Sequence, residues 1–332
     1  MSRPWLQPLV PVYRLALALR EMRLRSGLEP VRRLRWPVIS IGNLSTGGTG
    51  KTPLTIALAR TLTARGTHVD VLSRGYGRRS ALPLQVNPSG TAEDFGDEPL
   101  LIAREAGVPV YVAAQRYEAG LMAEAAWPQN EGESQQVRAH ILDDGFQHRQ
   151  LHRDVDIVLI NRHDWLDRLL PAGNLREPLR ALFRASVIAI PAEDPQFEAE
   201  LKAFGWQGPI WRLRRKMEID MEDGPVDGPV AAFCGIARPG QFFHGLEKGG
   251  LRLAARIPFP DHYQYTEARV RHLLAAAEST GATALMTTEK DLVRLGHLAA
   301  MFPESLPLKT AHLTIEIEDE AAAMEWLVAK LK

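Results

Sequence analysis

The chain has 332 residues, of which 45% are hydrophobic and 24% charged, as is usual for a folded protein of one or two domains. Lysine plus arginine and aspartate plus glutamate each total 40, so the composition offers no overall basic field for nucleic acid. The single cysteine, Cys234, excludes an intrachain disulfide and a multi-cysteine metal cluster. Nothing in the composition indicates an obligate protein partner.

The first 36 residues are basic, with eight arginines and two acids for a net charge of +6. A helix is predicted from Pro11, since apolar residues recur at helical spacing on one face: Val12, Leu15, Ala16, Leu19 and Met22. Arg14 and Arg20 interrupt the segment far short of the roughly 20 apolar residues of a transmembrane span. Two interpretations stay open: a helix on an anionic membrane surface, or a helix packed on the protein with a solvated basic face.

Residues 43–54 read Asn-Leu-Ser-Thr-Gly-Gly-Thr-Gly-Lys-Thr-Pro-Leu, between a β-branched run at 37–42 and a helical pattern at 55–65. This order of strand, glycine loop and helix predicts a P-loop that binds a nucleoside triphosphate. The predicted phosphate-binding residues are Ser45, Thr46, Gly47, Gly48, Thr49, Gly50, Lys51 and Thr52. Lys51 can reach the terminal phosphates and the Thr52 hydroxyl can ligate Mg²⁺, whereas Ser45 stands where the usual pattern has glycine.

Further along the chain, apolar strands alternate with helical patterns. This predicts an α/β fold of the P-loop NTPase type, with a doubly wound, mostly parallel sheet and a second, smaller α/β domain. Strands are predicted at 68–73, 108–113, 137–142, 155–160, 186–191, 230–235, 251–258 and 282–287, and helices at 95–106, 116–126, 241–248, 266–280 and 318–332. The predicted division is an N-terminal region at 1–36, a P-loop domain at 37–221, a linker at 222–229 and a smaller domain at 230–332, whose last helix can pack back on the P-loop domain.

Two acidic pairs are candidates for the chemistry. Asp143 and Asp144 end an apolar strand, where a P-loop enzyme needs a carboxylate to hold Mg²⁺. Neighbouring strand residues point to opposite sides, so we expect one of the two to ligate the ion, and the pattern leaves open which. Asp97 and Glu98 begin a helix, where they can assist Mg²⁺ and accept a hydroxyl proton, or simply cap the helix.

The smaller domain contributes an aromatic loop, Phe259-Pro-Asp-His-Tyr-Gln-Tyr265. A histidine beside a carboxylate can be held in one tautomer for proton transfer, so His262 is a candidate catalytic residue. The same pattern also occurs in surface turns. The basic loop Arg74-Gly-Tyr-Gly-Arg-Arg79 follows a predicted strand, where open α/β sheets bind ligands.

Seven short motifs occur in order along nearly the whole chain. They are Gly-Gly-Thr-Gly-Lys-Thr-Pro, Ser73-Arg-Gly-Tyr-Gly-Arg78, Gly96-Asp-Glu-Pro99, Leu142-Asp-Asp-Gly-Phe-Gln-His148, Asn174-Leu-Arg-Glu-Pro178, Phe259-Pro-Asp-His262 and Thr288-Glu-Lys-Asp291. Together they resemble the tetraacyldisaccharide 4′-kinase family of lipid A biosynthesis. The resemblance implies that ATP phosphorylates the 4′-hydroxyl of a tetraacylated glucosamine disaccharide 1-phosphate, at the cytoplasmic face of a Gram-negative inner membrane. It also favours the membrane interpretation of the N-terminal helix.

The resemblance implies roles for single residues. Asp97 is expected to act as base toward the sugar hydroxyl, with help from His262, while Lys51 holds ATP. Glu98, Thr52 and the Asp143/Asp144 pair are expected to serve Mg²⁺. Candidate contacts to the lipid substrate or its phosphate are Arg74, Tyr76, Arg78, Arg116, Asn174 and Glu177.

Two alternatives to a lipid kinase are a regulatory NTPase and a soluble kinase. A membrane-associated regulatory P-loop NTPase is disfavoured, because the loop start lacks the lysine of partitioning-type ATPases and a guanine-reading Asn/Thr-Lys-x-Asp motif is absent. The other alternative is a soluble small-molecule kinase whose N-terminal helix is purely structural. Deletion of residues 1–25 separates this alternative from a membrane enzyme, because unchanged vesicle binding would remove the membrane role of the helix.

Overall fold

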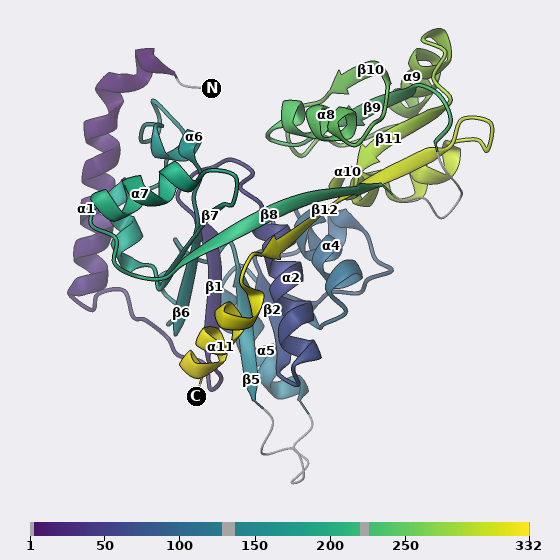
Figure 1. Ribbon diagram of the computed structural model, residues 1–332. Helices are drawn as coiled ribbons and strands as arrows, with labels where there is room; N and C mark the ends of the chain where they lie inside the picture. Colours follow the sequence, from purple (N-terminus) through teal and green to yellow (C-terminus); the bar gives the residue numbers. More distant parts are fainter. Residues whose placement is uncertain (1–2, 128–136, 220–225, 332) are drawn as a thin grey trace.

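The computed structural model describes residues 3–127, 137–219 and 226–331. Within these residues, twelve strands form one sheet in the order β10-β9-β11-β12-β8-β7-β6-β1-β5-β2-β4-β3. Two lobes share this sheet, and the chain passes between them along β8 and β12 (Figure 1). The predicted α/β fold with a mostly parallel sheet is confirmed.

The first lobe is built on parallel strands that are apolar on both faces. β1 (Val38–Asn43) is buried at every position and pairs in parallel with β5 and β6, as expected for a central strand covered by helices. The other strands are β2 (His68–Ser73), β3 (Leu84–Gln85), β4 (Val110–Val112), β5 (Arg138–Asp143), β6 (Val155–Leu159) and β7 (Val187–Pro191). The helices are α2 (Lys51–Ala64), α3 (Ala92–Phe95), α4 (Asp97–Ala106), α5 (Arg116–Ala126), α6 (Arg162–Trp165), α7 (Pro195–Ala203) and the 3₁₀ helix η3 (Leu179–Arg184).

The second lobe continues the same sheet with its own core. Its strands are β9 (Val230–Cys234), β10 (Leu253–Pro258) and β11 (Ala284–Thr288), and its helices are α8 (Pro239–Lys248), α9 (Glu267–Ser279), α10 (Glu289–Leu295) and the 3₁₀ helix η4 (Gly296–Met301). Phe233 of β9 is fully buried among apolar side chains of α9 and β11. The sole cysteine, Cys234, is buried at the end of β9.

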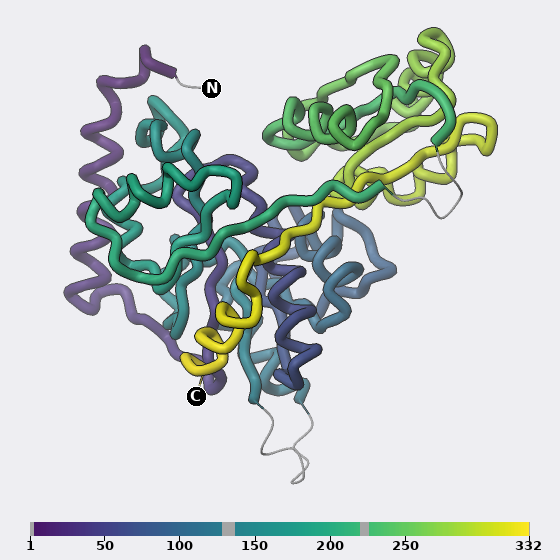
Figure 2. The backbone as a smooth tube through the Cα atoms, viewed as in Figure 1, coloured from purple at the N-terminus to yellow at the C-terminus, as the bar shows by residue number. Residues whose placement is uncertain are grey.

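Two long strands that the sequence analysis did not predict join the lobes. β8 (Ile210–Ile219) and β12 (Leu308–Ile317) pair antiparallel along most of their length, and the tube view shows both passing between the lobes (Figure 2). After β12 the chain returns to the first lobe, where α11 (Glu320–Lys330) buries Met324 and Leu327 in the core beside β1 and α2. Residues 220–225, in and next to the predicted linker, lie outside the described part of the chain.

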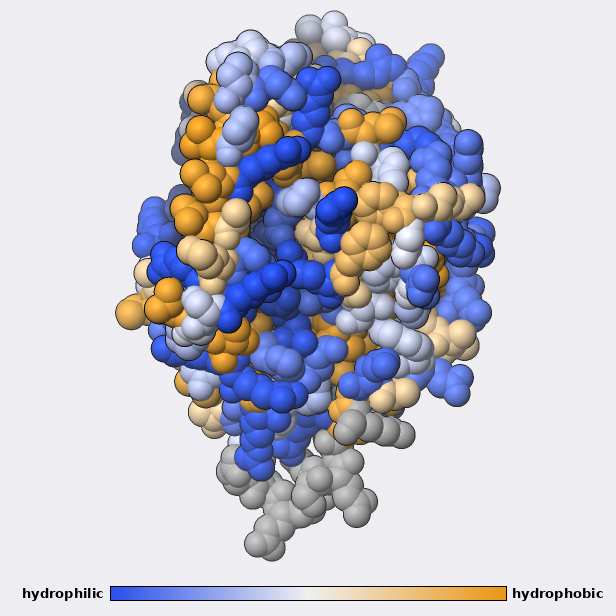
Figure 3. Space-filling view, turned by 90° about the vertical axis from the view of Figure 1, so that its left-hand side faces the viewer, coloured by the Kyte–Doolittle hydropathy of each residue, from blue (hydrophilic) through white to orange (hydrophobic). Residues whose placement is uncertain are grey.

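The N-terminal helix carries its apolar stripe on the outside. The 3₁₀ helix η1 (Pro4–Leu9) leads into α1 (Val10–Arg25), whose inward face bonds to the first lobe through Tyr13 Oη and the Arg176 carbonyl at 2.8 Å, and through Arg20 and the Gln147 carbonyl. The predicted apolar face is exposed: Val12, Leu15, Leu19 and Met22. The space-filling view of this side shows apolar side chains beside a recessed polar region (Figure 3). Among the described residues, no helix has the length and apolarity needed to span a bilayer.

A buried histidine lies near the start of β5, in the sheet of the first lobe. His140 of β5 lies between two carboxylates, with Nδ1 2.7 Å from Asp70 Oδ1 and Nε2 3.5 Å from Glu124 Oε1. Burial by itself lowers the pKa of His140, but the two carboxylates outweigh burial and raise it to about 9. Glu124 also accepts the backbone N–H groups of Arg35 and Trp36, so this cluster holds the segment between α1 and β1.

This cluster predicts a pH-dependent stability. The folded-state pKa of His140 lies above the unfolded value near 6.5, so its stabilisation is complete below pH 6.5 and is lost as pH rises through about 9. We expect the free energy of unfolding to fall by on the order of 3 kcal/mol across this window in wild type, and to change little in His140→Gln. Urea unfolding at several pH values measures this. The exposed-site variant His272→Gln should behave as wild type, and an equal slope in His140→Gln would contradict the prediction.

Candidate active site

The P-loop connects β1 to α2, and polar side chains of the loop bond to Asn43 at the end of β1. Gly50, the residue just before α2, has φ +95°, a conformation that glycine adopts without strain. Lys51 Nζ lies 3.3 Å from Asn43 Oδ1 and 3.6 Å from Asp144 Oδ1. The buried Ser45 hydroxyl accepts a hydrogen bond from Asn43 Nδ2 at 3.2 Å. The serine in place of the usual glycine therefore ties the loop back to the end of β1.

Two arginines from outside the first lobe's core approach the loop. Arg215 of β8 donates to the Thr49 carbonyl, and Arg238, which precedes α8, pairs with the buried Asp164 at 3.1 Å. A Cβ atom added at Gly47 would meet the Arg238 guanidinium at 3.3 Å. The sequence analysis gave no role to either arginine.

Three carboxylates gather beside the P-loop. Asp143, at the end of β5, accepts from Thr55 Oγ1 at 3.3 Å and Ser73 Oγ at 3.4 Å, whereas Asp144 pairs with Arg176 at 2.9 Å. Burial, followed by the negative charges of Glu98 and Asp144, raises the pKa of Asp143 to about 7. Such a shift marks a site with too little positive charge for its carboxylates, and a bound Mg²⁺ would supply that charge.

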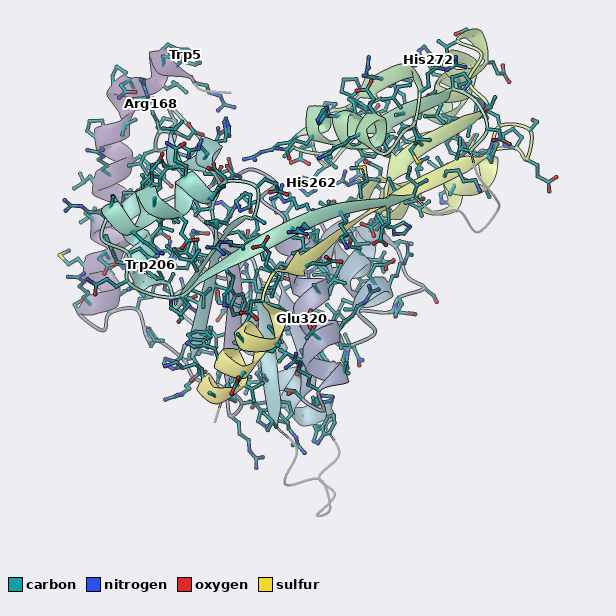
Figure 4. All side chains as sticks on the ribbon, in the orientation of Figure 1. Trp5, Arg168, Trp206, His262, His272 and Glu320 are labelled. Carbon is teal, nitrogen blue, oxygen red and sulfur yellow. The ribbon has the colours of Figure 1, made fainter. Side chains whose placement is uncertain are left out.

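The predicted base and histidine meet across the lobes. Asp97 Oδ2, at the start of α4, accepts His262 Nδ1 at 2.9 Å and Arg294 Nε at 2.8 Å. Burial opposes ionisation of Asp97, but the hydrogen bond from His262 and the charge of Arg294 hold its pKa well below the usual range. The bond to Asp97 raises the pKa of His262. Figure 4 places His262 between the two lobes, where its side chain is half-buried.

Backbone strain also singles out this region. Among the described residues, Asp144 and His262 are the non-glycine residues with positive φ, at 47° and 58°. Non-glycine residues in this region are uncommon and concentrate at functional sites, because the surrounding structure must hold them there. Asp144 belongs to the carboxylate cluster beside the P-loop, and His262 bonds to Asp97.

A basic pocket lies between Asp144, beside the P-loop, and the N-terminal helix. Its volume is about 500 Å³, and its lining includes Asp144, His148 and five arginines: Arg20, Arg32, Arg74, Arg116 and Arg176. Burial, and then the charges of nearby arginines, lower the pKa of His148 to about 3, so this ring is neutral at pH 7. Arg116 is buried, and its Nε finds no hydrogen-bond partner in the described part of the protein. The pocket therefore suits an anionic ligand.

Comparison with known proteins gives the family. A family model described as tetraacyldisaccharide-1-P 4′-kinase matches residues 2–332. The tetraacyldisaccharide 4′-kinase of Koribacter versatilis is 40% identical over 331 residues, covering 97% of this chain and 98% of that protein. The chain belongs to the tetraacyldisaccharide-1-phosphate 4′-kinase family.

A solved structure agrees with this assignment. The crystal structure of Aquifex aeolicus LpxK, described as an "apo" form in complex with ATP, matches with a TM-score of 0.75 and 31% identity over 98% of each chain. The tetraacyldisaccharide 4′-kinase of Geobacter sulfurreducens is 39% identical over 92% of this chain and 90% of that protein. The family resemblance drawn from the seven motifs, and the prediction that the chain is a kinase, are confirmed.

Not every predicted substrate-contact residue of this kinase lines the pocket. Arg74 and Arg116 do, and Tyr76 packs against His262 with 5.4 Å between ring centroids. Asn174 instead donates to Asp167 at 2.7 Å and accepts the Thr46 N–H through its carbonyl. The backbone carbonyl of Asn174 therefore supports the start of the P-loop, while its side chain bonds to Asp167.

The two remaining candidates, Glu177 and Arg78, do not line the pocket either. Glu177 is buried and pairs with Arg184 at 2.7 Å. Both terminal nitrogens of the Arg78 guanidinium are buried and have no hydrogen-bond partner within the described residues. The Arg78 side chain folds over Gly75, in the loop beside Tyr76.

Several residues of the site were missed by the sequence analysis. Arg294 binds Asp97, and Lys290 pairs with Glu98 at 2.5 Å. Lys290 belongs to the Thr288-Glu-Lys-Asp291 motif. The sequence analysis recognised this motif but gave none of its residues a role. Arg294 lies one helical turn beyond that motif, and nothing in the local sequence distinguishes it from a surface arginine.

Proposed function

We propose that this chain transfers the γ-phosphate of ATP to the 4′-hydroxyl of a tetraacylated glucosamine disaccharide 1-phosphate, at the cytoplasmic face of the inner membrane. The observation that carries the proposal is the basic pocket, because it runs from Asp144 beside the P-loop to Arg20 on the exposed N-terminal helix. An anionic lipid could thus place its sugar headgroup at the phosphate site while its acyl chains stay near α1. Family membership supports the same substrate.

The nucleotide and its metal would be held by the loop and the carboxylate cluster. The backbone of residues 45–50 and the Lys51 ammonium would hold the phosphates, and Thr52, Glu98, Asp143 and Asp144 are the proposed Mg²⁺ ligands or second contacts. Mg²⁺, when bound, neutralises charge on the transferring phosphoryl group. Because Asp144 already pairs with Arg176 and Lys51, Asp143 is the carboxylate that most needs this cation.

The proton of the sugar hydroxyl would leave through the Asp97–His262 pair. Asp97 is strongly acidic in this setting, so it is better suited to hold the imidazole than to keep a proton. We therefore assign the accepting atom to His262 Nε2, with Asp97 fixing the ring through Nδ1–H. This division of roles differs from the sequence-based assignment of Asp97 as the base. Arg294 would keep Asp97 ionised throughout.

Arg116 offers a test of the pocket. A charged hydrogen bond to substrate is worth about 1.5–3 kcal/mol, so Arg116→Met should raise the KM for the lipid acceptor by about 10- to 100-fold. The KM for ATP should stay near wild type. The matched control is Arg104→Met, at a residue on α4 that is not part of the pocket lining. An unchanged acceptor KM would remove Arg116 from the substrate site.

The exposed stripe of α1 predicts membrane binding. Leu15 and Leu19 are 60% and 48% exposed. Burying one such side chain in the membrane–water interface is favourable by up to about 3 kcal/mol. Leu15→Asp/Leu19→Asp should weaken binding to anionic phosphatidylglycerol vesicles at least about tenfold in a sedimentation assay. Leu82→Asp, at a 70% exposed leucine far along the chain, is the control. Equal binding of all three proteins would exclude α1 as the membrane contact.

The activity itself is tested with γ-labelled ATP and a tetraacylated disaccharide 1-phosphate in mixed micelles. We expect label in the lipid at the 4′ position, identified by mass spectrometry after selective hydrolysis of the 1-phosphate. The same acceptor already phosphorylated at the 4′-hydroxyl is the negative control. Nucleotide hydrolysis without transfer to lipid would contradict the kinase assignment and favour a regulatory NTPase.

A further inference from the structure

A mixed cluster of two carboxylates and one imidazole lies where the lobes meet, apart from the residues assigned above. One ligand atom each from Glu105, Glu289 and His312 lies within 4.8 Å of the other two. Glu105 is in the last turn of α4, Glu289 is the first residue of α10, and His312 is on β12. The cluster therefore joins a helix of the first lobe to a helix of the second lobe and to one of the two strands that connect the lobes (Figure 1).

The three side chains are partly enclosed and already oriented. Their side chains are 31%, 16% and 31% exposed for Glu105, Glu289 and His312. His312 Nδ1 lies 2.7 Å from Glu289 Oε1, and the other Glu289 oxygen accepts the Leu313 N–H at 3.4 Å. Arg60 donates to the Glu105 carboxylate at 3.1 Å and to its backbone carbonyl at 2.7 Å. Neighbouring groups that hold each ligand in this way are typical of metal sites.

The donor set indicates the class of ion. Mg²⁺ and Ca²⁺ prefer oxygen ligands alone, whereas a histidine with carboxylates suits Zn²⁺ and neighbouring transition metals. Zinc–ligand bonds of about 2.1 Å place tetrahedral ligand atoms about 3.4 Å apart, so no pair of these atoms needs to approach by more than about 1.4 Å. Rotation of glutamate side chains covers that distance. His312 Nδ1 and Glu289 Oε1, now 2.7 Å apart, need to separate slightly to admit the ion. Three protein ligands leave a fourth position for water.

We propose that Glu105, Glu289 and His312 form a binding site for a divalent transition-metal ion of the zinc class, which bridges the two lobes. The ion replaces the proton shared by His312 and Glu289 and adds Glu105 from the opposite lobe. The same α4–α10 contact carries the Asp97–Arg294 and Glu98–Lys290 pairs. Occupancy of the site thus fastens α10 to α4, a little over two helical turns from Asp97.

Zinc binding to the full-length chain tests the proposal without any turnover measurement. The protein is stripped with a chelator, kept in excess Mg²⁺ to occupy the carboxylates beside the P-loop, and titrated with ZnCl₂ against a chromogenic zinc indicator. We expect one Zn²⁺ to bind wild type at least about tenfold more tightly than it binds His312→Gln or Glu105→Gln, since loss of even a supporting residue costs about 10- to 100-fold. His272→Gln, on the exposed face of α9, is the matched control and should bind as wild type.

Thermal melting gives an independent readout. At the same zinc concentration, the melting temperature should rise less in both ligand variants than in wild type and His272→Gln, because the stabilisation of the folded state grows with its affinity for the ion. Melting in chelator verifies that the variants fold, and glutamine at 312 keeps a donor for Glu289. Equal zinc affinity in wild type and His312→Gln would overturn the site. Full affinity in Glu105→Gln would overturn the bridge between the lobes.

Discussion

His262→Gln is expected to lower kcat by about 10²- to 10⁴-fold, the usual contribution of a general base, while the melting temperature stays close to that of wild type. The ring is half-buried, and its removal leaves the Asp97–Arg294 pair intact. Steady-state transfer of labelled phosphate to lipid measures kcat. His244→Gln, in the same lobe on α8, is the control. Turnover within threefold of wild type would exclude His262 from proton transfer.

Asp97→Asn should have the same effect on kcat and a further effect on stability. The Arg294 side chain is 1% exposed and would keep Asp291 at 3.2 Å as its remaining acidic partner. Removing one partner of such a buried pair destabilises by on the order of 3 kcal/mol, so this variant should melt at a lower temperature. Loss of activity in both variants, with loss of stability in one, separates the role of the imidazole from that of the carboxylate.

The pH profile distinguishes the two possible bases. An imidazole accepts a proton only when neutral, and the bond to Asp97 raises the pKa of His262 above its usual 6.5. In wild type, kcat should therefore rise with pH through this raised pKa. Asp97→Asn removes the main cause of the shift, so its residual activity should rise at lower pH. If Asp97 were the base, the profile would be flat across this range, because the pKa of Asp97 lies far below it.

Lys51→Ala should lower kcat by about 10²- to 10³-fold, the loss found when one preorganised charge on the reacting group is removed. The Lys51 side chain is mostly buried, and its Nζ lies between Asn43 and Asp144, next to the glycine loop. Lipid phosphorylation and nucleotide hydrolysis should fall together, since both need the same phosphate contact. The control is Lys202→Ala, at a 63% exposed lysine on α7. Activity within threefold of wild type would exclude Lys51 from the phosphate site.

Local patterns predicted most of the strands and helices. β1 and α2 formed where the apolar run and the helical spacing around the P-loop indicated, because a buried parallel strand is recognisable from its own residues. β8 was missed although its apolar and polar residues alternate, as in Trp211-Arg212-Leu213-Arg214. Its partner β12 lies about a hundred residues away, and alternation alone does not identify the pairing.

The apolar stripe of α1 illustrates a different limit. Helical spacing predicted the stripe, but the same spacing fits a helix buried against a core and a helix on a membrane. Val12, Leu15 and Leu19 turned out to face outward, while Tyr13 and Arg20 contact the first lobe. The direction in which an amphipathic helix faces depends on the surface it meets, and that surface is formed by distant segments.

By itself, the sequence determined the α/β fold class, the family and the residue types of the donor site, because strand, glycine loop, helix and short motifs are local patterns. Only the tertiary structure decided how Asp97 is held. Its partners His262 and Arg294 are 165 and 197 positions away, and they arrive through a lobe attached by two long strands. The ionisation of a buried carboxylate depends on which charges surround it, and distances of that kind are set by packing between lobes.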